Sequence, residues 1–317
     1  MKARPELLAR YVLPASEAPR FPLDWHAVFG RSAPLVAELG FGNGEYLAWD
    51  AARRPDHDFV GIELPLQCFL RAASNLGRAG VGNARLVRGD GRYLLRELFA
   101  GASLRAVLLQ FPMPWPKERH AKHRVTGSRL AETLAGVLEP GGAFELVTDQ
   151  EWFAQAAYAD FAADAAFTVD PLEAATERAF LTRYERRWTA AGRRIHRLVA
   201  RLRTPRACER LCREGNMHAS RLKTAPSEAA VAALAGARFA GEREVGEVKE
   251  VLRARDGWLL RVVTADDSFT QFFFLRLLAN PDGSALLRVE EQPRPYPTPA
   301  VRHLVEALAL ALDRPAG

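Results

Sequence analysis

The chain has 317 residues, a formal net charge of +6 and a sequence pI of about 9.5. Its 48% hydrophobic and 26% charged residues are ordinary for a soluble globular protein. No run is apolar and long enough to cross a membrane, and no secretory signal opens the chain, so a membrane-spanning protein is excluded and a cytoplasmic one is expected. The basic balance favours polyanionic partners.

The three cysteines, Cys68, Cys208 and Cys212, cannot all pair and include no CxxC motif, which argues against a disulfide scaffold and a cysteine-only zinc site. Cys208 and Cys212 lie four residues apart with His218 nearby. A metal site needs more ligands at sharper spacing, so two cysteines on one helix face are the better interpretation. We therefore predict no metal and a reducing compartment.

The length predicts two domains, since about 100–200 residues per domain is usual. Residues 1–33 are rich in proline and predict an extended N-terminal arm in which Trp25 and Phe29 pack on the body. A change in composition near residue 204 divides a larger domain, 34–204, from a C-terminal module, 205–317. The sequence does not determine the oligomeric state, for which a monomer is the expectation.

A glycine loop opens the larger domain. A strand is predicted over 35–40, a helix over 45–54, and a second strand over 59–63 that ends in an acid. This order is a βαβ unit, and its glycines let the backbone approach a ligand closely. The loop reads Glu38-x-Gly40-x-Gly42-x-Gly44.

The acids decide between two kinds of cofactor. Glu63 follows Gly44 by nineteen residues, the separation at which an acid hydrogen-bonds ribose hydroxyls. A dinucleotide site requires GxGxxG for its pyrophosphate, whereas Glu38 before the first glycine suits a cationic ligand. The pattern predicts S-adenosylmethionine, which carries an ammonium and a sulfonium; the alternative is that the glycines serve only a tight turn.

Asp90 follows a predicted helix over 65–79 and a third strand over 84–88. Its carboxylate has two interpretations. It accepts a hydrogen bond from the adenine amino group of the cofactor, or it caps the helix predicted over 92–99. The sequence leaves both open.

The most distinctive stretch, 111–124, follows the fourth predicted strand, 104–110. Alternating prolines cannot continue a strand inside a sheet, so the stretch leaves as a stiff loop at the strand's carboxyl end, where ligands bind in open α/β sheets. An aromatic side chain followed by cations suits a base and its phosphates; the alternative is a loop whose tryptophan plugs the core. The residues expected to contact nucleic acid are Trp115, Lys117, Arg119, His120, Lys122 and Arg124.

The rest of the larger domain contains another acid and an arginine-rich segment. Asp149 directly follows a predicted strand, at the end where ligands collect. Between Arg183 and Arg213, eleven arginines stand against two acids, which favours a phosphate-facing surface over an ordinary solvated charge run. The predicted elements are helices over 128–138 and 150–163 and strands over 143–147 and 195–202.

The C-terminal module has the pattern of an antiparallel meander, because four apolar-rich runs alternate with turn residues. A stiff linker, 292–297, then leads to an amphipathic helix over 299–312. We predict a small α+β module with a four-stranded sheet and no catalytic motif. The four runs are 249–255, 258–264, 269–278 and 284–290.

Taken in order, the motifs of residues 34–200 resemble those of the bacterial single-chain tRNA (guanine-N7)-methyltransferases. The C-terminal third lies outside the family's common core and is similar to the long extensions of some thermophile-type members. The resemblance implies a class I S-adenosylmethionine-dependent fold, which is α/β and Rossmann-like with a mostly parallel sheet and helices on both faces. It also implies methylation of a guanine N7 in the variable loop of tRNA. The resembling motifs are Glu38-x-Gly40-x-Gly42-x-Gly44, Gly61-Ile62-Glu63, Phe111-Pro112-x-Pro114-Trp115-Pro116-Lys117-x-Arg119-His120-x-Lys122-x-Arg124, Thr148-Asp149, and Thr182-x-Tyr184-Glu185-x-Arg187 with Gly192 and Ile195.

The implied reaction is in-line attack of guanine N7 on the sulfonium methyl. N7 already exposes a lone pair, so no general base is required; the enzyme must position N7 and tolerate positive charge on the imidazole ring. The N1–H and N2–H₂ groups of guanine are donors that suit a bidentate carboxylate. Asp149 and Glu185 are the candidates for that carboxylate, with Thr182 assisting.

One position departs from the family pattern. The family's loop reads Pro-Asp-Pro-Trp, and here Met113 occupies the aspartate position, so no catalytic residue is assigned. Met113 can still pack against a base or the cofactor, and we expect retained binding with a cost in rate unless another acid, such as Asp149, supplies the missing field. Two alternatives stay open: a non-catalytic tRNA-binding protein of the same fold, and a methyltransferase of small molecules or proteins.

Overall fold

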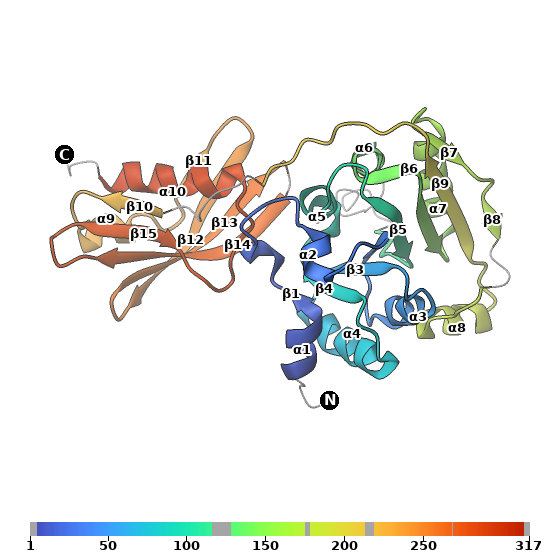
Figure 1. Cartoon of the computed structure of the whole chain (residues 1–317). Coiled ribbons are helices and arrows are strands. Elements are labelled where there is room, and N and C mark those ends of the chain that lie inside the picture. The colour runs from blue at the N-terminus through green and yellow to red at the C-terminus, as the bar shows by residue number, and fades with distance from the viewer. Residues whose placement is uncertain (1–4, 116–127, 175–177, 213–218, 268, 314–317) are drawn as a thin grey trace. The chain divides into compact units, whose positions relative to one another are not determined.

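The computed structural model describes residues 5–115, 128–174, 178–212, 219–267 and 269–313. The chain divides into two compact units, each with its own sheet (Figure 1). Unit 1 comprises the described residues up to Ala15 together with Pro22–Glu209. Unit 2 comprises Ser16–Phe21 and the described residues from Arg210 onward.

The sheet of unit 1 has the strand order β1-β4-β3-β2-β5-β6-β9-β7, with β8 paired to β9. The strands from β1 to β6 in this order are parallel, and β9 returns antiparallel beside β6. All five residues of β2 are buried, as expected for a strand inside a parallel sheet. The strands are β1 (Val12–Leu13), β2 (Leu35–Leu39), β3 (Asp58–Glu63), β4 (Ala84–Arg88), β5 (Leu104–Gln110), β6 (Leu138–Thr148), β7 (Phe167–Val169), β8 (Glu173–Ala174) and β9 (His196–Leu202).

Helices cover both faces of this sheet. Val36 of β2 packs in a core cluster with residues of α1, α3 and α4. Leu39 lies against Gly91 at the start of α5, and residues 36 and 39 point to opposite faces because side chains alternate along a strand. The predicted α/β class with a mostly parallel sheet is therefore confirmed. The helices of unit 1 are α1 (Pro5–Tyr11), α2 (Trp25–Phe29), α3 (Glu45–Arg53), α4 (Leu66–Ala79), α5 (Gly91–Leu98), α6 (Ser128–Val137), α7 (Glu151–Ala162) and α8 (Arg183–Ala190), and a 3₁₀ turn spans Ala15–Glu17.

The prediction of an extended N-terminal arm is wrong. The described part forms α1, then β1 in parallel pairing with β4, then α2. Pro5 does not prevent the first helix, because proline is well tolerated in a first helical turn. Tyr11 is fully buried, and its hydroxyl donates to the Val81 carbonyl at 2.8 Å. The expected packing of Trp25 is confirmed, since its buried ring stacks on Phe99 with centroids 5.1 Å apart.

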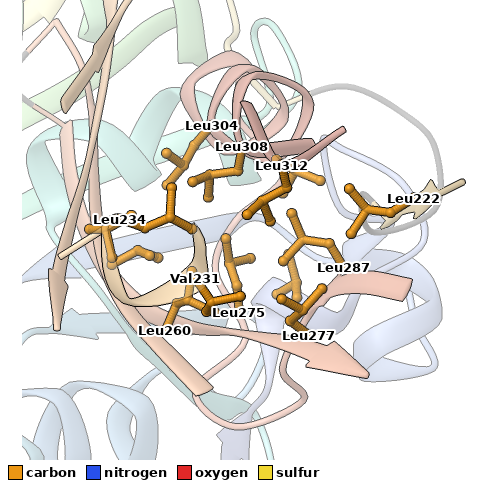
Figure 2. Close-up of a cluster of buried hydrophobic side chains, with 14 of the residues drawn as sticks. Leu222, Val231, Leu234, Leu260, Leu275, Leu277, Leu287, Leu304, Leu308 and Leu312 are labelled. Atoms are coloured by element: carbon orange, nitrogen blue, oxygen red, sulfur yellow. The ribbon is translucent and has the colours of Figure 1, made fainter. Parts of the chain in front are cut away.

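Unit 2 is a six-stranded antiparallel sheet in the order β10-β15-β14-β13-β12-β11. The helix α10 (Pro299–Leu312) packs on it, and Leu304, Leu308 and Leu312 of that helix join a core with Leu260 and Leu275 of the sheet (Figure 2). The spacing of those helix leucines by four residues is the amphipathic pattern that predicted the helix. The strands are β10 (Ala219–Leu222), β11 (Arg238–Ala240), β12 (Glu244–Ala254), β13 (Gly257–Asp266), β14 (Phe269–Ala279) and β15 (Ala285–Val289), and a short helix, α9, spans Glu228–Ala232.

The predicted sheet of four strands is too small by two. The central meander, β12 to β15, is confirmed, whereas the edge strands β10 and β11 were not predicted. These edge strands have four and three residues, which is too short to show the alternation that reveals a strand. Within the described residues, no helix has the length and apolar character that a membrane span requires.

Candidate functional site

A cavity of about 390 Å³ opens in unit 1 at the carboxyl ends of the parallel strands, the edge where α/β sheets bind ligands. Its size is within the usual range for small-ligand sites. Four segments form its wall: the end of β2 and the loop into α3, the end of β5 and the following loop, the residues after β6, and α8 with the turn after it. The lining residues are Glu38, 40–43, Glu45, Tyr46, 110–114, Asp149, Gln150, Thr182, Tyr184, Trp188 and Arg193.

The glycine loop is held by its backbone conformation. Gly40, Gly42 and Gly44 have φ values of +70°, +54° and +68°, the left-handed region that glycine adopts without strain. A Cβ at Gly40 or Gly42 would meet no atom within 4 Å, so open space adjoins the backbone there. A Cβ at Gly44 would stand 2.7 Å from that of Ala72, so this glycine also lets α3 begin close against α4.

Glu38 is a buried acid on the cavity wall. Its side chain is 2% exposed, and Oε2 has no hydrogen-bond partner among the described residues. Burial raises the pKa of the Glu38 carboxyl to about 8, and the neighbouring carboxylates of Asp50 and Glu63 add to the rise. The Arg178 cation opposes this rise without cancelling it. Burying an acid is costly, and a ligand cation in the cavity would reduce that cost.

Glu63 anchors the glycine loop. One carboxylate oxygen accepts from the Gly42 N–H at 2.9 Å, and the other accepts from the Leu64 N–H at 2.8 Å. The end of β3 is thereby tied to the loop that follows β2. Glu63 is not among the described residues that line the cavity, so its contact with a ribose stays a prediction.

Asp90 caps α5, which is one of its two interpretations. Its carboxylate accepts from the backbone N–H of Arg92 at 3.0 Å and pairs with the Arg92 guanidinium. The side chain is half-buried and does not reach the described cavity wall. The adenine contact therefore stays a prediction.

The proline-rich loop forms one wall of the cavity. Phe111 and Trp115 both have positive φ, +51° and +47°, so the chain turns sharply at each end of the described part. Met113 is 66% exposed at the cavity wall, and Trp115 is 36% exposed, which argues against a tryptophan that plugs the core. The predicted contacts Lys117, Arg119, His120, Lys122 and Arg124 lie outside the described residues.

The predicted guanine-binding acids have different surroundings. Asp149 lines the cavity, pairs with Arg193 and accepts from the Gln150 amide at 2.8 Å. Glu185 is 1% exposed and forms a capping box at the start of α8 with Thr182. Its N–H donates to the Thr182 hydroxyl at 3.2 Å, and its carboxylate accepts from the Thr182 N–H at 3.3 Å. Asp149 and Thr182 thus lie at the cavity, while Glu185 lies behind it.

Sequence reasoning missed Arg178, which holds the Glu185 carboxylate. Its Nη1 lies 3.0 Å from both carboxylate oxygens, and its Nη2 donates to Gln110 Oε1 at 2.7 Å. The guanidinium also lies over the rings of Tyr46 and Phe111, at 5.5 and 5.9 Å. Burial raises the pKa of the Glu185 carboxyl, and Arg178 opposes that rise. No sequence pattern marks Arg178, because its partners come from separate elements.

Aromatic side chains on α8 complete the wall. Tyr184 and Trp188 lie four residues apart, so both face the same side of the helix and line the cavity. The Arg193 guanidinium lies 4.0 Å from the centroid of the Trp188 ring, which is a cation–π contact. This contact holds Arg193 in place beside Asp149, with which it forms an ion pair. The four-residue spacing of Tyr184 and Trp188 is the signal in the sequence that points to Trp188.

Comparison with known proteins gives consistent matches. The model of the family described as "Putative methyltransferase" matches residues 32–198. The chain is 39% identical over 307 residues to the tRNA (guanine-N(7)-)-methyltransferase of Thermotoga maritima, covering 93% of this chain and 95% of that protein. It is 31% identical to the Thermus thermophilus protein of the same name, covering 93% and 94%. The like-named protein of Cutibacterium acnes is 36% identical and matches 59% of this chain.

Proposed function

The chain belongs to the family of tRNA (guanine-N7)-methyltransferases, and from this premise we propose that the cavity of unit 1 is where the methyl group reaches guanine. The protein has the class I S-adenosylmethionine-dependent fold and catalyses methylation of guanine N7 in tRNA. We propose a variable-loop guanine as the target and the cytoplasm as the location, supported by the motif resemblance and by the tRNA substrate. The observation that carries the assignment of the site is the buried Glu38 carboxyl on the wall of a cavity formed by the family's motifs, because its Oε2 has no hydrogen-bond partner among the described residues.

The residues of the cavity fit S-adenosylmethionine. The Glu38 carboxylate would compensate a ligand cation, and the open space beside Gly40 and Gly42 would admit the ligand against the backbone. Glu63 fixes the shape of that loop through the Gly42 N–H. When bound, the cofactor supplies an electrophilic methyl group on a positively charged sulfur.

The guanine is proposed to enter between the proline-rich loop and α8. Tyr184 and Trp188 offer aromatic faces there, and Asp149 offers a carboxylate for the N1–H and N2–H₂ donors. Glu185 is the weaker candidate for that contact, because it is buried and both of its carboxylate oxygens accept from Arg178, whereas Gln150 and Arg193 both contact Oδ2 of Asp149. These groups would orient N7 toward the methyl, which is the main requirement when no proton has to be removed.

Met113 does not prevent this chemistry. A thioether cannot act as an acid or a base, but attack by N7 requires neither. Met113 lines the cavity, so it can pack against the bound base or cofactor. The relatives described above are named as methyltransferases, and nothing in these matches favours the alternative of a non-catalytic tRNA-binding protein.

The test is a methyl-transfer assay with the full chain, methyl-labelled S-adenosylmethionine and an unmodified tRNA transcript. The expected product is one 7-methylguanosine per tRNA, mapped by nuclease digestion to the variable loop. A transcript with adenosine at that position is the control and should stay unlabelled. Absence of 7-methylguanosine from every tRNA tested would overturn the function, and label elsewhere in the tRNA would overturn the proposed target.

A further inference from the structure

The arginine-rich segment after residue 182 separates into paired and unpaired side chains. Four of its arginines form ion pairs within unit 1 and so serve to neutralise local acids. By contrast, Arg183, Arg186 and Arg187 are exposed, and among the described residues no acidic side chain lies within 4.0 Å of their guanidinium nitrogens. The Arg186 guanidinium donates to the Leu181 carbonyl at 2.9 Å, and those of Arg183 and Arg187 lie 5.9 and 5.6 Å from the ring centroids of Tyr184 and Trp188. The four pairs are Arg193 with Asp149, Arg197 with Glu145, Arg201 with Asp170, and Arg206 with Asp164.

The geometry of α8 places the three arginines without an acidic partner beside the cavity. At 3.6 residues per turn, Arg183, Arg186 and Arg187 project from one side of the helix. Tyr184 and Trp188 project from the adjacent side and line the cavity. The capping box at Thr182 and the buried Glu185 fix the start of this helix and therefore the direction of both sides. A row of cations thus runs along the aromatic wall.

We propose that this α8 arginine face, formed by Arg183, Arg186 and Arg187, binds the phosphate backbone of the RNA strand whose guanine enters the cavity. The proposal rests on the proposed function, which supplies the RNA. Aromatic faces next to cations match the two parts of a nucleotide, the base and its phosphates. Guanidinium groups suit phosphate because they donate paired hydrogen bonds in one plane. Among the described residues no acid neutralises these side chains. A phosphate would supply that negative charge, and a neutral partner would not.

The experiment measures tRNA binding as a function of salt concentration. Each arginine is changed to glutamine singly and together (Arg183→Gln, Arg186→Gln, Arg187→Gln), and the dissociation constant for tRNA is measured by fluorescence anisotropy in about 50 to 200 mM KCl. The logarithm of the association constant falls linearly with the logarithm of the salt concentration. Each lost phosphate contact should reduce the steepness of this line by about 0.7–0.9, so the triple variant should reduce it by roughly 2–3. The KM for tRNA should rise about tenfold per arginine, while kcat at saturating tRNA and the affinity for S-adenosylmethionine stay unchanged.

A matched control is Arg78→Gln, an exposed arginine on α4 that hydrogen-bonds only its neighbour Asn75 among the described residues. It removes one positive charge elsewhere on the same unit and should leave the KM for tRNA unchanged. Lysine at the three α8 positions should restore most of the salt slope, because it keeps the charge. Thermal unfolding of each variant checks that the fold is intact.

The outcomes separate this proposal from the proposed function. If the wild type makes 7-methylguanosine but the triple variant keeps the same salt slope and KM, the arginine face does not bind phosphate and the function stands. A fall in kcat with unchanged KM would also overturn the proposal, because it would place these arginines in the chemistry and not in backbone binding. If the wild type makes no 7-methylguanosine, the function fails, and the salt slope still decides whether the face binds RNA.

Discussion

Glu38 is buried, and its Oε2 has no hydrogen-bond partner among the described residues, so we expect it to make cofactor binding sensitive to pH. Burial raises the pKa of its carboxyl to about 8. A cationic ligand favours the ionised carboxylate, so below that pKa binding must expel a proton. The affinity for S-adenosylmethionine should therefore rise with pH, by up to about tenfold per unit, and level off above about pH 8.

Isothermal titration calorimetry between about pH 6 and pH 9 checks this prediction. Titrations in two buffers with different ionisation heats count the protons released. In Glu38→Gln the affinity should be lower and almost independent of pH, since the amide cannot ionise. A wild-type affinity that does not change across this range would show that Glu38 does not meet the ligand cation.

Met113 offers a second test at a single residue. Asparagine and aspartate have nearly the same shape, so Met113→Asp and Met113→Asn differ in charge alone. We expect Met113→Asp to raise kcat by a few-fold relative to Met113→Asn, because a carboxylate stabilises the positive charge that develops on the guanine ring. The gain should be modest, since the side chain at this position is 66% exposed and water screens its field. Equal kcat values for the two variants would show that the loop charge is dispensable here.

At the scale of elements, Arg178 connects three parts of the site: the end of β5, α3 and the cap of α8. Its side chain is 9% exposed, and that of Glu185 is 1% exposed. Removing one partner of a buried pair leaves an uncompensated charge, which costs about 3–5 kcal/mol. Arg178→Leu should lower the free energy of unfolding by about that amount and move both Gln110 and the α8 cap from their present positions.

A double-mutant cycle isolates the pair. The double variant, which carries both Arg178→Leu and Glu185→Leu, should have a higher free energy of unfolding than the sum of the two single effects predicts. The reason is that no buried charge is left without its partner. The matched control is the exposed pair Arg221–Asp282, for which the coupling should be below about 1 kcal/mol. Urea unfolding gives the free energies. Additive effects of Arg178→Leu and Glu185→Leu would show that the two groups do not support each other.

The elements that sequence predicted well share a strong local signal. Strands β2 to β5 lie within one residue of their predicted bounds, because each is an apolar run bordered by glycine, proline or charged residues. The arm before β2 was predicted wrongly, because its prolines suggested an extended chain while Tyr11 and Trp25 bury against the body. Tertiary burial, which no local pattern encodes, decides such segments.

The residues of the candidate site were predictable from the sequence only where they lie at the ends of predicted strands. Glu38 lies near the end of β2, and the glycines and Asp149 follow strands directly. Because the carboxyl ends of neighbouring parallel strands meet at one edge, the sequence could place these residues together. Arg178 could not be found in this way. It meets Gln110 across 68 positions of sequence, and only the folded chain brings the two together. Similarly, the arginine-rich segment looked uniform until the fold assigned acids to some of its members.

At the scale of the whole molecule, the candidate site lies in one of the two units. Unit 1 holds the cavity and the motifs of the methyltransferase family. Unit 2 buries its own leucine-rich core between α10 and the antiparallel sheet. A core of its own is what a chain segment needs to fold independently. The sequence predicted a boundary near residue 204, where its composition changes and the alternation of strands with helices gives way to a meander. The units divide at Glu209 and Arg210, and Ser16–Phe21 belongs to unit 2.

The anchoring of the glycine loop by Glu63 has a consequence for the chemistry of that position. A carboxylate offers about four acceptor directions, and the N–H groups of Gly42 and Leu64 occupy one on each oxygen. One direction on each oxygen is left, which equals the number of hydroxyl donors on the cis-diol of a ribose. A glutamine here would turn an amide NH₂ toward one of the two N–H groups. Donor would then face donor, so either the tie from Gly42 to the end of β3 or the bond from the neighbouring Leu64 N–H would be lost before any ligand arrived.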